Sequence, residues 1–283
     1  MSKSQRWRDR RMTMVGNTRV IDPAMHSVDI ISCYREAKPF IEQHHYSGSF
    51  PATRLSCGLF RNHEGRSQLV GAASFSVSMQ QKAGAKHTGL ENHCSVELGR
   101  LVLLDHIEAN AESWFLSRAF RLLRQEKPDI EAVFSYSDPV SRTDQDGRSI
   151  MPGHVGLVYQ ALNAHCRGRA RARSLLIMPN GRVASERALS KIRSEDTGRD
   201  YAEKQLLDAG APVRNFLETP ANWLKRLEAE GFFDKVRHPG NWVYAFPLTP
   251  RAKQASKRLP MEAYPKKNPH TVQGDVSLMP LGI

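Results

Sequence analysis

The chain of 283 residues carries 41 Lys and Arg against 29 Asp and Glu, which gives a net charge of +12 at pH 7. Its length and its hydrophobic content of 40% allow a sizeable buried core, and no stretch reaches the roughly 20 apolar residues of a membrane span. We therefore expect a globular cytoplasmic protein with no membrane partner. The positive charge favours a polyanion, first of all nucleic acid, because basic side chains that meet phosphates release counterions; a solvated basic surface is the alternative.

The four cysteines predict neither a disulfide framework nor a zinc ribbon. They are scattered without C-x-x-C spacing, at Cys33, Cys57, Cys94 and Cys166. We expect them to be reduced and to pack as small hydrophobic side chains.

We expect the two ends of the chain to be arms that lie outside the main domain. Residues 1–22 are Arg-rich without periodicity, and residues 251–283 contain many Pro and Lys. Between them, residues 23–250 are expected to form the main domain, with a helical insertion at about residues 195–235. No internal repeat is present.

Helical and strand patterns alternate along this domain. A helix over residues 34–43, interrupted by Pro39, precedes two strands in "RLSCGLFRNHEGRSQLVGAASFSV" that the turn "NHEG" joins. Then follow the strand "VELGRLVLL", a helix over Trp114–Gln125 and the strand "IEAVFSYS". A helix from about Val155, the strand "RARSLLIM", further helices that end at glycines, and the strand "NWVYAFPL" complete the order. The order predicts an α/β fold with a central mixed sheet flanked by helices.

One junction is a candidate anion site. The strand in "ELGRLVLLDHIEANAESWFLSRAF" leads through a short polar turn into a helix. A helix N-terminus presents free N–H groups and the positive end of the helix dipole, so a phosphorylated cofactor is the expected ligand.

Four motifs carry a family resemblance. The order of strand, turn, helix, strand and Tyr-containing helix resembles the GNAT acyltransferase fold. The stretches "ELGRL", "NAESWFLSRA", "FSYSDP" and "GHVGLVYQALN" resemble the Mom family of phage DNA-modification proteins. The resemblance runs from about His44 to Ile177, with a weaker similarity in "HPGNWVYAFPL".

The resemblance implies a GNAT-like transferase that converts adenine in phage DNA to an N6-carbamoylmethyl derivative and so protects the DNA from host restriction. It also implies acetyl-CoA and iron as cofactors and double-stranded DNA as the partner. The cofactor contacts that it implies are Leu101, Leu103, Asn110, Ser113 and Tyr159. One departure concerns the turn "DHIEANAES", which has no glycine where GNAT enzymes wrap the CoA pyrophosphate.

Tyr159 is the expected proton donor. In a GNAT fold, a Tyr at this place protonates the leaving thiolate, and a phenol with a pKa near 10 suits a thiolate of pKa about 8.5. The alternative is a core tyrosine whose hydroxyl reaches the edge of the core.

Asp138 follows the strand "FSYS" and precedes a proline, so its carboxylate stands at a strand end, where α/β sites form. It is expected to accept a proton from the adenine amine or to ligate a metal; an Asx turn is the alternative. Ser135 and Ser137 point to one side of the same strand by alternation and complete the candidate catalytic set.

Arg100 is a charge inside an apolar strand and therefore needs a partner. Alternation places Glu97 on the opposite face, so we expect Arg100 either to pair structurally, for instance with Asp138, or to grip substrate. In "HHYSG", His45 is the candidate catalytic and metal-binding residue, paired with Asp138 as iron ligands, since imidazole and carboxylate suit iron. Surface histidines are the alternative.

Basic side chains are expected to bind DNA. In "HCRGRARARS", period-two spacing would place four guanidinium groups on one face of an extended segment; a basic edge strand is the alternative. The segment "SRTDQDGRS" is expected to be a flexible loop beside Asp138 that closes over DNA. The expected DNA contacts are Arg142, Arg148, Arg167, Arg169, Arg171 and Arg173.

Two rival functions stay open: an ordinary acyl-CoA N-acyltransferase acting on a small amine or a protein, and a non-catalytic nucleic-acid-binding protein on a GNAT scaffold. The sequence does not decide the oligomeric state, and a homodimer is one option.

Overall fold

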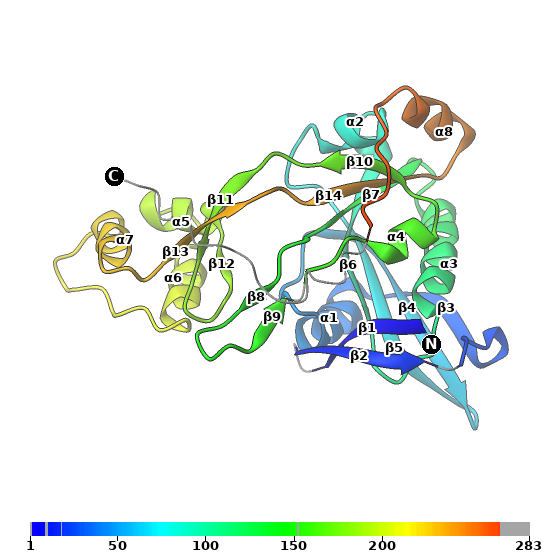
Figure 1. Ribbon diagram of the computed structural model, residues 1–283, viewed down its shortest axis with the longest axis horizontal. Helices are drawn as coiled ribbons and strands as arrows, with labels where there is room; N and C mark the ends of the chain where they lie inside the picture. The colour runs from blue at the N-terminus through cyan, green and yellow to red at the C-terminus, as the bar shows by residue number, and fades with distance from the viewer. Residues whose placement is uncertain (1, 9–10, 18, 152, 267–283) are drawn as a thin grey trace. The chain divides into compact units, whose positions relative to one another are not determined.

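The computed structural model describes residues 2–8, 11–17, 19–151 and 153–266. They form two compact units (Figure 1). The first unit takes its described residues from 1–139, 153–170 and 241–268, and the second takes them from 140–152 and 171–240. The insertion expected at residues 195–235 falls within the second unit, which also includes the preceding strands.

The first unit is built on a 7-stranded mixed sheet in the order β10-β14-β7-β6-β5-β4-β3. All neighbours are antiparallel except β6 and β7, which run parallel. The strands are β3 (His26–Ile31), β4 (Thr53–His63), β5 (Arg66–Ser76), β6 (Ser95–Leu103), β7 (Ala132–Ser137), β10 (His165–Arg169) and β14 (Trp242–Pro247). The expected central mixed sheet with flanking helices is confirmed.

The hairpin of β4 and β5 forms where the sequence predicts it. Its turn residues Glu64 and Gly65 both have positive φ, 50° and 73°. Two consecutive residues with positive φ belong to the tight turn whose twist matches that of paired strands. Local sequence therefore fixes this register.

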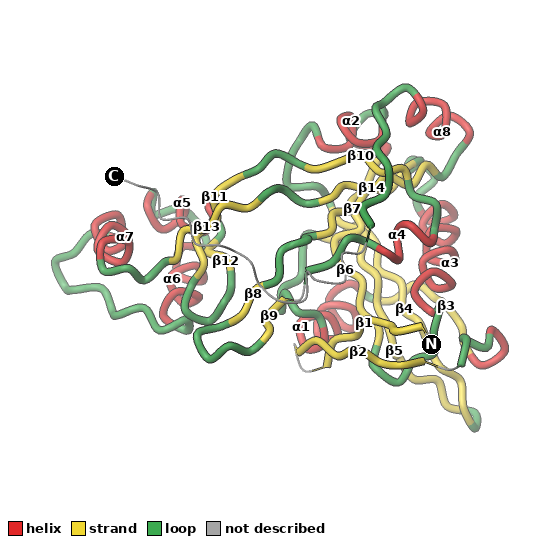
Figure 2. The backbone as a smooth tube through the Cα atoms, viewed as in Figure 1, coloured by secondary structure: helices red, strands yellow, loops and turns green. Residues whose placement is uncertain are grey.

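Helices cover both faces of the sheet (Figure 2). Helix α3 (Ala111–Glu126) packs Phe115, Leu116 and Leu123 into the main core, together with side chains of β4, β5 and β6. On the opposite face, the π-helical turn η2 (Cys33–Ala37) leads into α1 (Lys38–His44), and Ile41 packs there with side chains of β5 and β6.

The remaining short helices of the first unit are η1 (Pro23–Met25), α2 (Ala83–Thr88), η3 (Asn92–Cys94), α4 (Leu157–Ala161) and α8 (Pro250–Lys257). The helix expected from Val155 is short because Asn163 is left-handed, with φ 54°, and the chain then enters β10.

The expected terminal arms contain regular structure. Residues of the N-terminal arm form β1 (Ser2–Arg8) and β2 (Arg11–Asn17), an antiparallel pair. The C-terminal segment begins with α8, and Tyr264 then donates its hydroxyl proton to the carbonyl of Ala164 at 2.7 Å. The rest of the expected tail, residues 267–283, lies outside the described residues.

The second unit has its own core beneath a 3-stranded sheet in the order β12-β11-β13. Its largest fully buried side chain is Trp223, which is 1% exposed. Its elements are β8 (Arg142–Thr143), β9 (Ser149–Met151), β11 (Arg173–Ile177), β12 (Val183–Ala184), α5 (Glu186–Arg193), α6 (Arg199–Leu207), α7 (Pro220–Ala229) and β13 (Asp234–His238). Across all described residues of the protein, no helix has the length and apolar character needed to cross a membrane.

Candidate active site

The central feature of the first unit is the place where β6 and β7 separate. The two parallel strands pair only from Ser95 opposite Ala132 to Glu97 opposite Phe134, although both strands continue. Beyond this point β6 remains paired with β5, and β7 with β14. The facing edges of β6 and β7 therefore leave backbone groups available for other partners.

A β-bulge lies in β6 at the same place. Phe75 of β5 pairs with Leu98, whereas its neighbour Ser74 pairs with Arg100, so β6 holds one extra residue, Gly99. A Cβ on Gly99 would lie 2.5 Å from Oγ of Ser76. Only glycine fits this position without a rearrangement of the serine.

The bulge changes which side chains share a face. Glu97 lies opposite Ser76 and Arg100 lies opposite Ser74, and residues two apart on β5 project to the same side. The prediction that Glu97 and Arg100 lie on opposite faces is therefore wrong. The two charges are near enough that Glu97 raises the pKa of Arg100, against the lowering caused by burial.

Ser135 of β7 joins the two sides of the separation. Its Oγ lies 2.9 Å from the carbonyl oxygen of Leu98 on β6 and 3.0 Å from the hydroxyl of Tyr159 on α4. A serine hydroxyl has one proton and two acceptor positions, so it can donate to only one of these oxygens at a time. Ser135 is 1% exposed and Tyr159 is 8% exposed, so this bridge is shielded from water.

Burial raises the pKa of Tyr159 to about 12, while the hydrogen bond from Ser135 opposes that rise and the charge of Glu97 adds to it. Burial also raises the pKa of the Glu97 carboxyl, which Arg100 partly offsets. Within the described part of the chain, the Glu97 side chain makes no hydrogen bond or ion pair. The site thus contains the protonated phenol of Tyr159 and the partly buried carboxyl group of Glu97, whose charge contributes to the raised pKa of the phenol.

Arg100 fastens the segment after α1 to β6. Its Nε donates to the carbonyl of Ser49 at 2.9 Å, its Nη2 donates to Oγ of Ser49 at 2.9 Å, and its Nη1 donates to the carbonyl of Gly99 at 2.6 Å. Of the two expected roles, the structural one is visible: two donors of the guanidinium group hold the loop that carries His45, and the third binds β6 itself.

His45 is buried and neutral. Its Nδ1 accepts the backbone N–H of Ser47 at 3.1 Å, so this nitrogen carries no proton in that bond. Burial holds the pKa of His45 well below its ordinary value, and Arg100 and His154 lower it further. His45 therefore belongs to the site as an uncharged imidazole.

Asp138 directly follows β7 and lies next to His154. Its backbone carbonyl accepts the N–H of His154 at 2.7 Å, and its charge partly offsets the burial that lowers the pKa of His154 to about 4. In the same strand, Ser137 is fully buried and its Oγ has no hydrogen-bond partner among the described residues.

An iron centre does not fit the described residues. Nowhere in residues 19–151 and 153–266 do three His, Cys, Asp or Glu side chains come together to hold a metal ion. His45 and Asp138 would need a third protein ligand for the facial arrangement usual in non-haem iron enzymes.

The turn before α3 leaves backbone N–H groups without a partner in the described chain. Asn110, with φ 64°, takes the left-handed conformation that the missing glycine would otherwise supply. The amides of Ala111 and Ser113 have no hydrogen bond within the described chain, whereas the amide of Ala109 donates to the carbonyl of Arg19. The Ser113 hydroxyl donates to the carbonyl of Asn110 at 3.1 Å, so the expected phosphate contact through this hydroxyl competes with a local bond.

The other two expected cofactor contacts differ in burial. Leu103 is 3% exposed and packs in the main core. Leu101 is half-buried against the same core.

The arginine run does not form one extended face. A register shift between Cys166 and Arg169, with Gly168 at φ 76°, breaks the alternation in β10. Arg167 turns inward and donates to the carbonyls of His87, Ser256, Leu259 and Pro260. The prediction of a single face is therefore wrong, and Arg167 is held by the backbone of its own unit.

The other three arginines of the run are exposed: Arg169, on the face of Trp242 in the first unit, and Arg171 and Arg173 in the second unit.

The loop expected over residues 141–149 is a hairpin. Strands β8 and β9 pair, and the Asp144 side chain accepts the N–H groups of Asp146 and Arg148 in its turn. Arg142 donates to the sulfur of Met151 at 2.6 Å, and Arg148 is 67% exposed beside Asp146. The prediction of a flexible loop missed this Asx-type turn.

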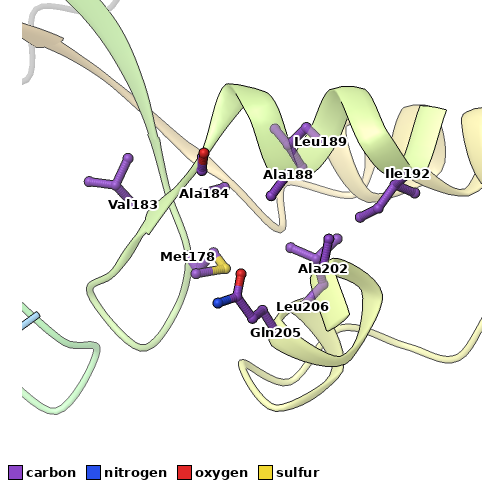
Figure 3. A pocket seen from close by; sticks show the side chains of 10 residues that line it. Met178, Val183, Ala184, Ala188, Leu189, Ile192, Ala202, Gln205 and Leu206 are labelled. Atoms are coloured by element: carbon purple, nitrogen blue, oxygen red, sulfur yellow. The ribbon is translucent and has the colours of Figure 1, made fainter. Parts of the chain in front are cut away.

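A small hollow in the second unit lies between α5, α6 and β12 (Figure 3). Apolar side chains line most of it, and Gln205 is the polar exception among its labelled residues. It contains no acid or base, so its chemistry is that of core packing.

Comparison with known proteins gives the family. The model of the Mom protein family matches residues 26–266. The chain belongs to the Mom protein family. Over 138 residues this Mom-family chain is 30% identical to the protein named methylcarbamoylase mom of Escherichia phage Mu. The match covers 48% of this chain and 51% of that relative, about half its length.

Solved structures similar to the Mom-family chain share little sequence with it. A tandem GNAT protein from the clavulanic acid biosynthesis pathway aligns with 80% of this chain and 99% of its own, with a TM-score of 0.38 and 8% identity. A malonyl-CoA decarboxylase from Cupriavidus metallidurans aligns with 74% of this chain and 44% of its own, with a TM-score of 0.30 and 11% identity.

Sequence reasoning missed Glu97 as a site residue of the Mom-family chain. The signal was Gly99 in the middle of "ELGRL", because a glycine inside a strand often marks a bulge. His154 was also missed, and no local motif distinguishes it from other histidines of the chain.

Proposed function

We propose that this Mom-family chain modifies DNA by placing a carbamoylmethyl group on N6 of adenine. Family membership supports DNA as the substrate class, and the name of the phage Mu relative supports the transferred group. The observation that carries the proposal is the place where β6 and β7 separate: Glu97 of β6 has no hydrogen bond or ion pair from its side chain within the described chain, and its charge contributes to the raised pKa of the buried Tyr159.

The transfer needs one proton acceptor and one proton donor. The N6 nitrogen forms a bond to the methylene carbon of a donor X–CH2–CO–NH2, and the bond from that carbon to X breaks. The N6 proton leaves to a base, and X leaves with a proton from an acid. An exocyclic amine is a weak nucleophile, so removal of its proton during attack lowers the barrier.

Glu97 is the proposed base and Tyr159 the proposed acid. A carboxyl whose pKa burial raises holds a proton more strongly than an ordinary glutamate, which suits a base. As Tyr159 gives up its proton, Ser135 can turn its own proton from the Leu98 carbonyl to the phenolate oxygen. Arg100 acts as a positioning residue through its bonds to Ser49.

Acetyl-CoA is the proposed cofactor, held at its phosphates by the amides of Ala111 and Ser113 at the start of α3. When bound, it would supply a two-carbon unit on a thiol leaving group. An acetyl group lacks the amide nitrogen of carbamoylmethyl, so the donor X–CH2–CO–NH2 must already contain this nitrogen before the transfer.

Double-stranded DNA is the proposed partner. The N6 amine is paired within the duplex, so the adenine must leave the stack to reach a buried acid and base. The net charge of +12 suits a polyanionic substrate.

Nucleoside mass spectrometry of DNA from bacteria that express the protein tests the proposal. We expect a deoxyadenosine heavier by one carbamoylmethyl group, absent with Tyr159→Phe and retained with a surface control, Tyr201→Phe. Unmodified DNA together with acylated amines or proteins would instead establish the generic acyltransferase. Unmodified DNA with binding alone would establish the non-catalytic DNA-binding protein.

A further inference from the structure

The second unit presents an apolar loop tip between α6 and α7, which is loop in Figure 2. Phe216 is 100% exposed and Leu217 is 91% exposed, and Val213 in the same loop is 75% exposed. Scattered exposed apolar residues are normal, but two adjacent large ones at a loop tip form a local apolar projection.

This loop is anchored at both of its ends. The Arg226 fork binds both carboxylate oxygens of Glu218, at 2.9 and 3.0 Å, and also the carbonyl of Val213 at 3.2 Å. The indole N–H of the buried Trp223 donates to the carbonyl of Pro212 at 2.9 Å. The conformation of the tip is therefore set before any partner arrives, which reduces the entropy lost on binding.

The tip also has a defined charge pattern. The exposed residues 212–217 contain one cation, Arg214, and one amide, Asn215, but no carboxylate. The neighbouring acid, Glu218, is neutralised by Arg226. The loop thus offers apolar side chains flanked by a positive charge and an amide, which complements an anionic groove with hydrogen-bond acceptors.

We propose that Phe216 and Leu217 form a wedge that enters the minor groove of duplex DNA and separates a stacked base step, with Arg214 and Asn215 in contact with the groove. Minor-groove proteins use Arg and Asn to contact this groove and insert Phe or Leu between base steps. The inference rests on the proposed function, because extraction of an adenine requires the stack to be opened.

The test measures duplex binding and base unstacking with full-length protein and duplexes that carry 2-aminopurine at successive A·T positions. With the wild type, 2-aminopurine fluorescence should rise on binding. Phe216→Ala combined with Leu217→Ala should abolish most of the rise and weaken binding about 5- to 150-fold, as expected for loss of roughly 1–3 kcal/mol of stacking. Because no charge is removed, the slope of log K against log salt should stay the same.

Two matched variants complete the test. Arg214→Ala should reduce the salt slope by up to about 0.9, since it removes one positive charge that would lie in the anionic groove and release counterions there. Tyr201→Ala, which removes an aromatic residue of α6 that is 66% exposed, should leave binding and fluorescence unchanged. Both wedge side chains are exposed, so thermal unfolding of the double variant should match that of the wild type.

The failure of the wedge and the failure of the chemistry are distinguishable. A fluorescence rise that depends on Phe216 and Leu217 supports the wedge even if mass spectrometry finds no modified adenine. Duplex binding without a rise, a rise that the double variant keeps, or no duplex binding at all would overturn it. A dimer of the wild type that the double variant dissociates, with unchanged DNA binding, would assign the loop to protein contact and also overturn it.

Discussion

Replacement of Glu97 by Gln should lower activity and raise stability in the same protein. The amide has nearly the size of the carboxylate, and no hydrogen bond to Glu97 is lost within the described chain, so the change removes the charge alone. Loss of a general base should reduce turnover by about 10²- to 10⁴-fold. The Glu97→Gln variant, although nearly inactive, should unfold at a higher temperature than the wild type at neutral pH.

The stability gain follows from the raised pKa of Glu97. Because the folded state holds the proton more tightly than the unfolded state, the ionised carboxylate destabilises the fold above its folded pKa, and this cost disappears below the ordinary pKa of about 4.3. A tenfold stronger binding of the proton by folded Glu97 corresponds to about 1.4 kcal/mol, and by this free energy of unfolding the Gln variant should be more stable at neutral pH. Thermal melts of both proteins from neutral pH to about pH 4, with modified nucleoside measured at neutral pH, check this. Loss of activity together with lower stability would show that the carboxylate has a structural role, and full activity would refute the assignment of the base.

The other predictions concern Tyr159, the arginine run and His87. Tyr159→Phe should reduce turnover while acetyl-CoA binding, measured by calorimetry, stays near that of the wild type, since the phenol acts after binding; a large loss of affinity would place Tyr159 in the cofactor site instead. Arg167→Ala should cost on the order of 3 kcal/mol of stability in denaturant unfolding, because buried carbonyls lose a charged donor. It should leave the salt slope of DNA binding unchanged, whereas Ala at Arg169, Arg171 and Arg173 should reduce the slope by up to about 0.9 each. His87 is 5% exposed, and its pKa is lowered to about 4. The free energy of unfolding should therefore fall by about 3 kcal/mol as the pH drops from 6.5 to below 4, because the unfolded state takes up the proton at a higher pH than the folded state. His87→Gln should remove this part of the acid sensitivity, and an equal dependence of stability on pH in both proteins would contradict the reasoning.

Much of the fold could be predicted because its local signals agree with its tertiary structure. The β4–β5 hairpin follows from the turn at Glu64 and Gly65, and α3 follows from its apolar spacing. The strand β10 was missed because "HCRGR" is polar and its glycine is left-handed. Its partner β14 comes from far along the chain, and such pairing leaves no local pattern.

Some members of the candidate site were expected from the sequence, but Glu97, His154 and the geometry of the site were not. Tyr159 and Ser135 were expected as separate members of the site, and the structure brings their hydroxyl oxygens to within 3.0 Å of each other. Simple alternation failed at Glu97, since one extra residue in a strand reverses the sides of everything that follows. The same error affected Arg167, whose spacing in sequence fits an exposed stripe but whose strand contains a register shift.

The position of β14 sets the order in which the protein can fold during synthesis. This strand lies between β7 and β10, although the residues of the second unit separate it from both in the sequence. The ribosome therefore releases residues 171–240 before the strand that completes the sheet of the first unit. Until then β7 and β10 each present an unpaired edge, the kind of surface that recruits other chains. Chains truncated before Trp242 should consequently aggregate, even though the second unit has a core of its own.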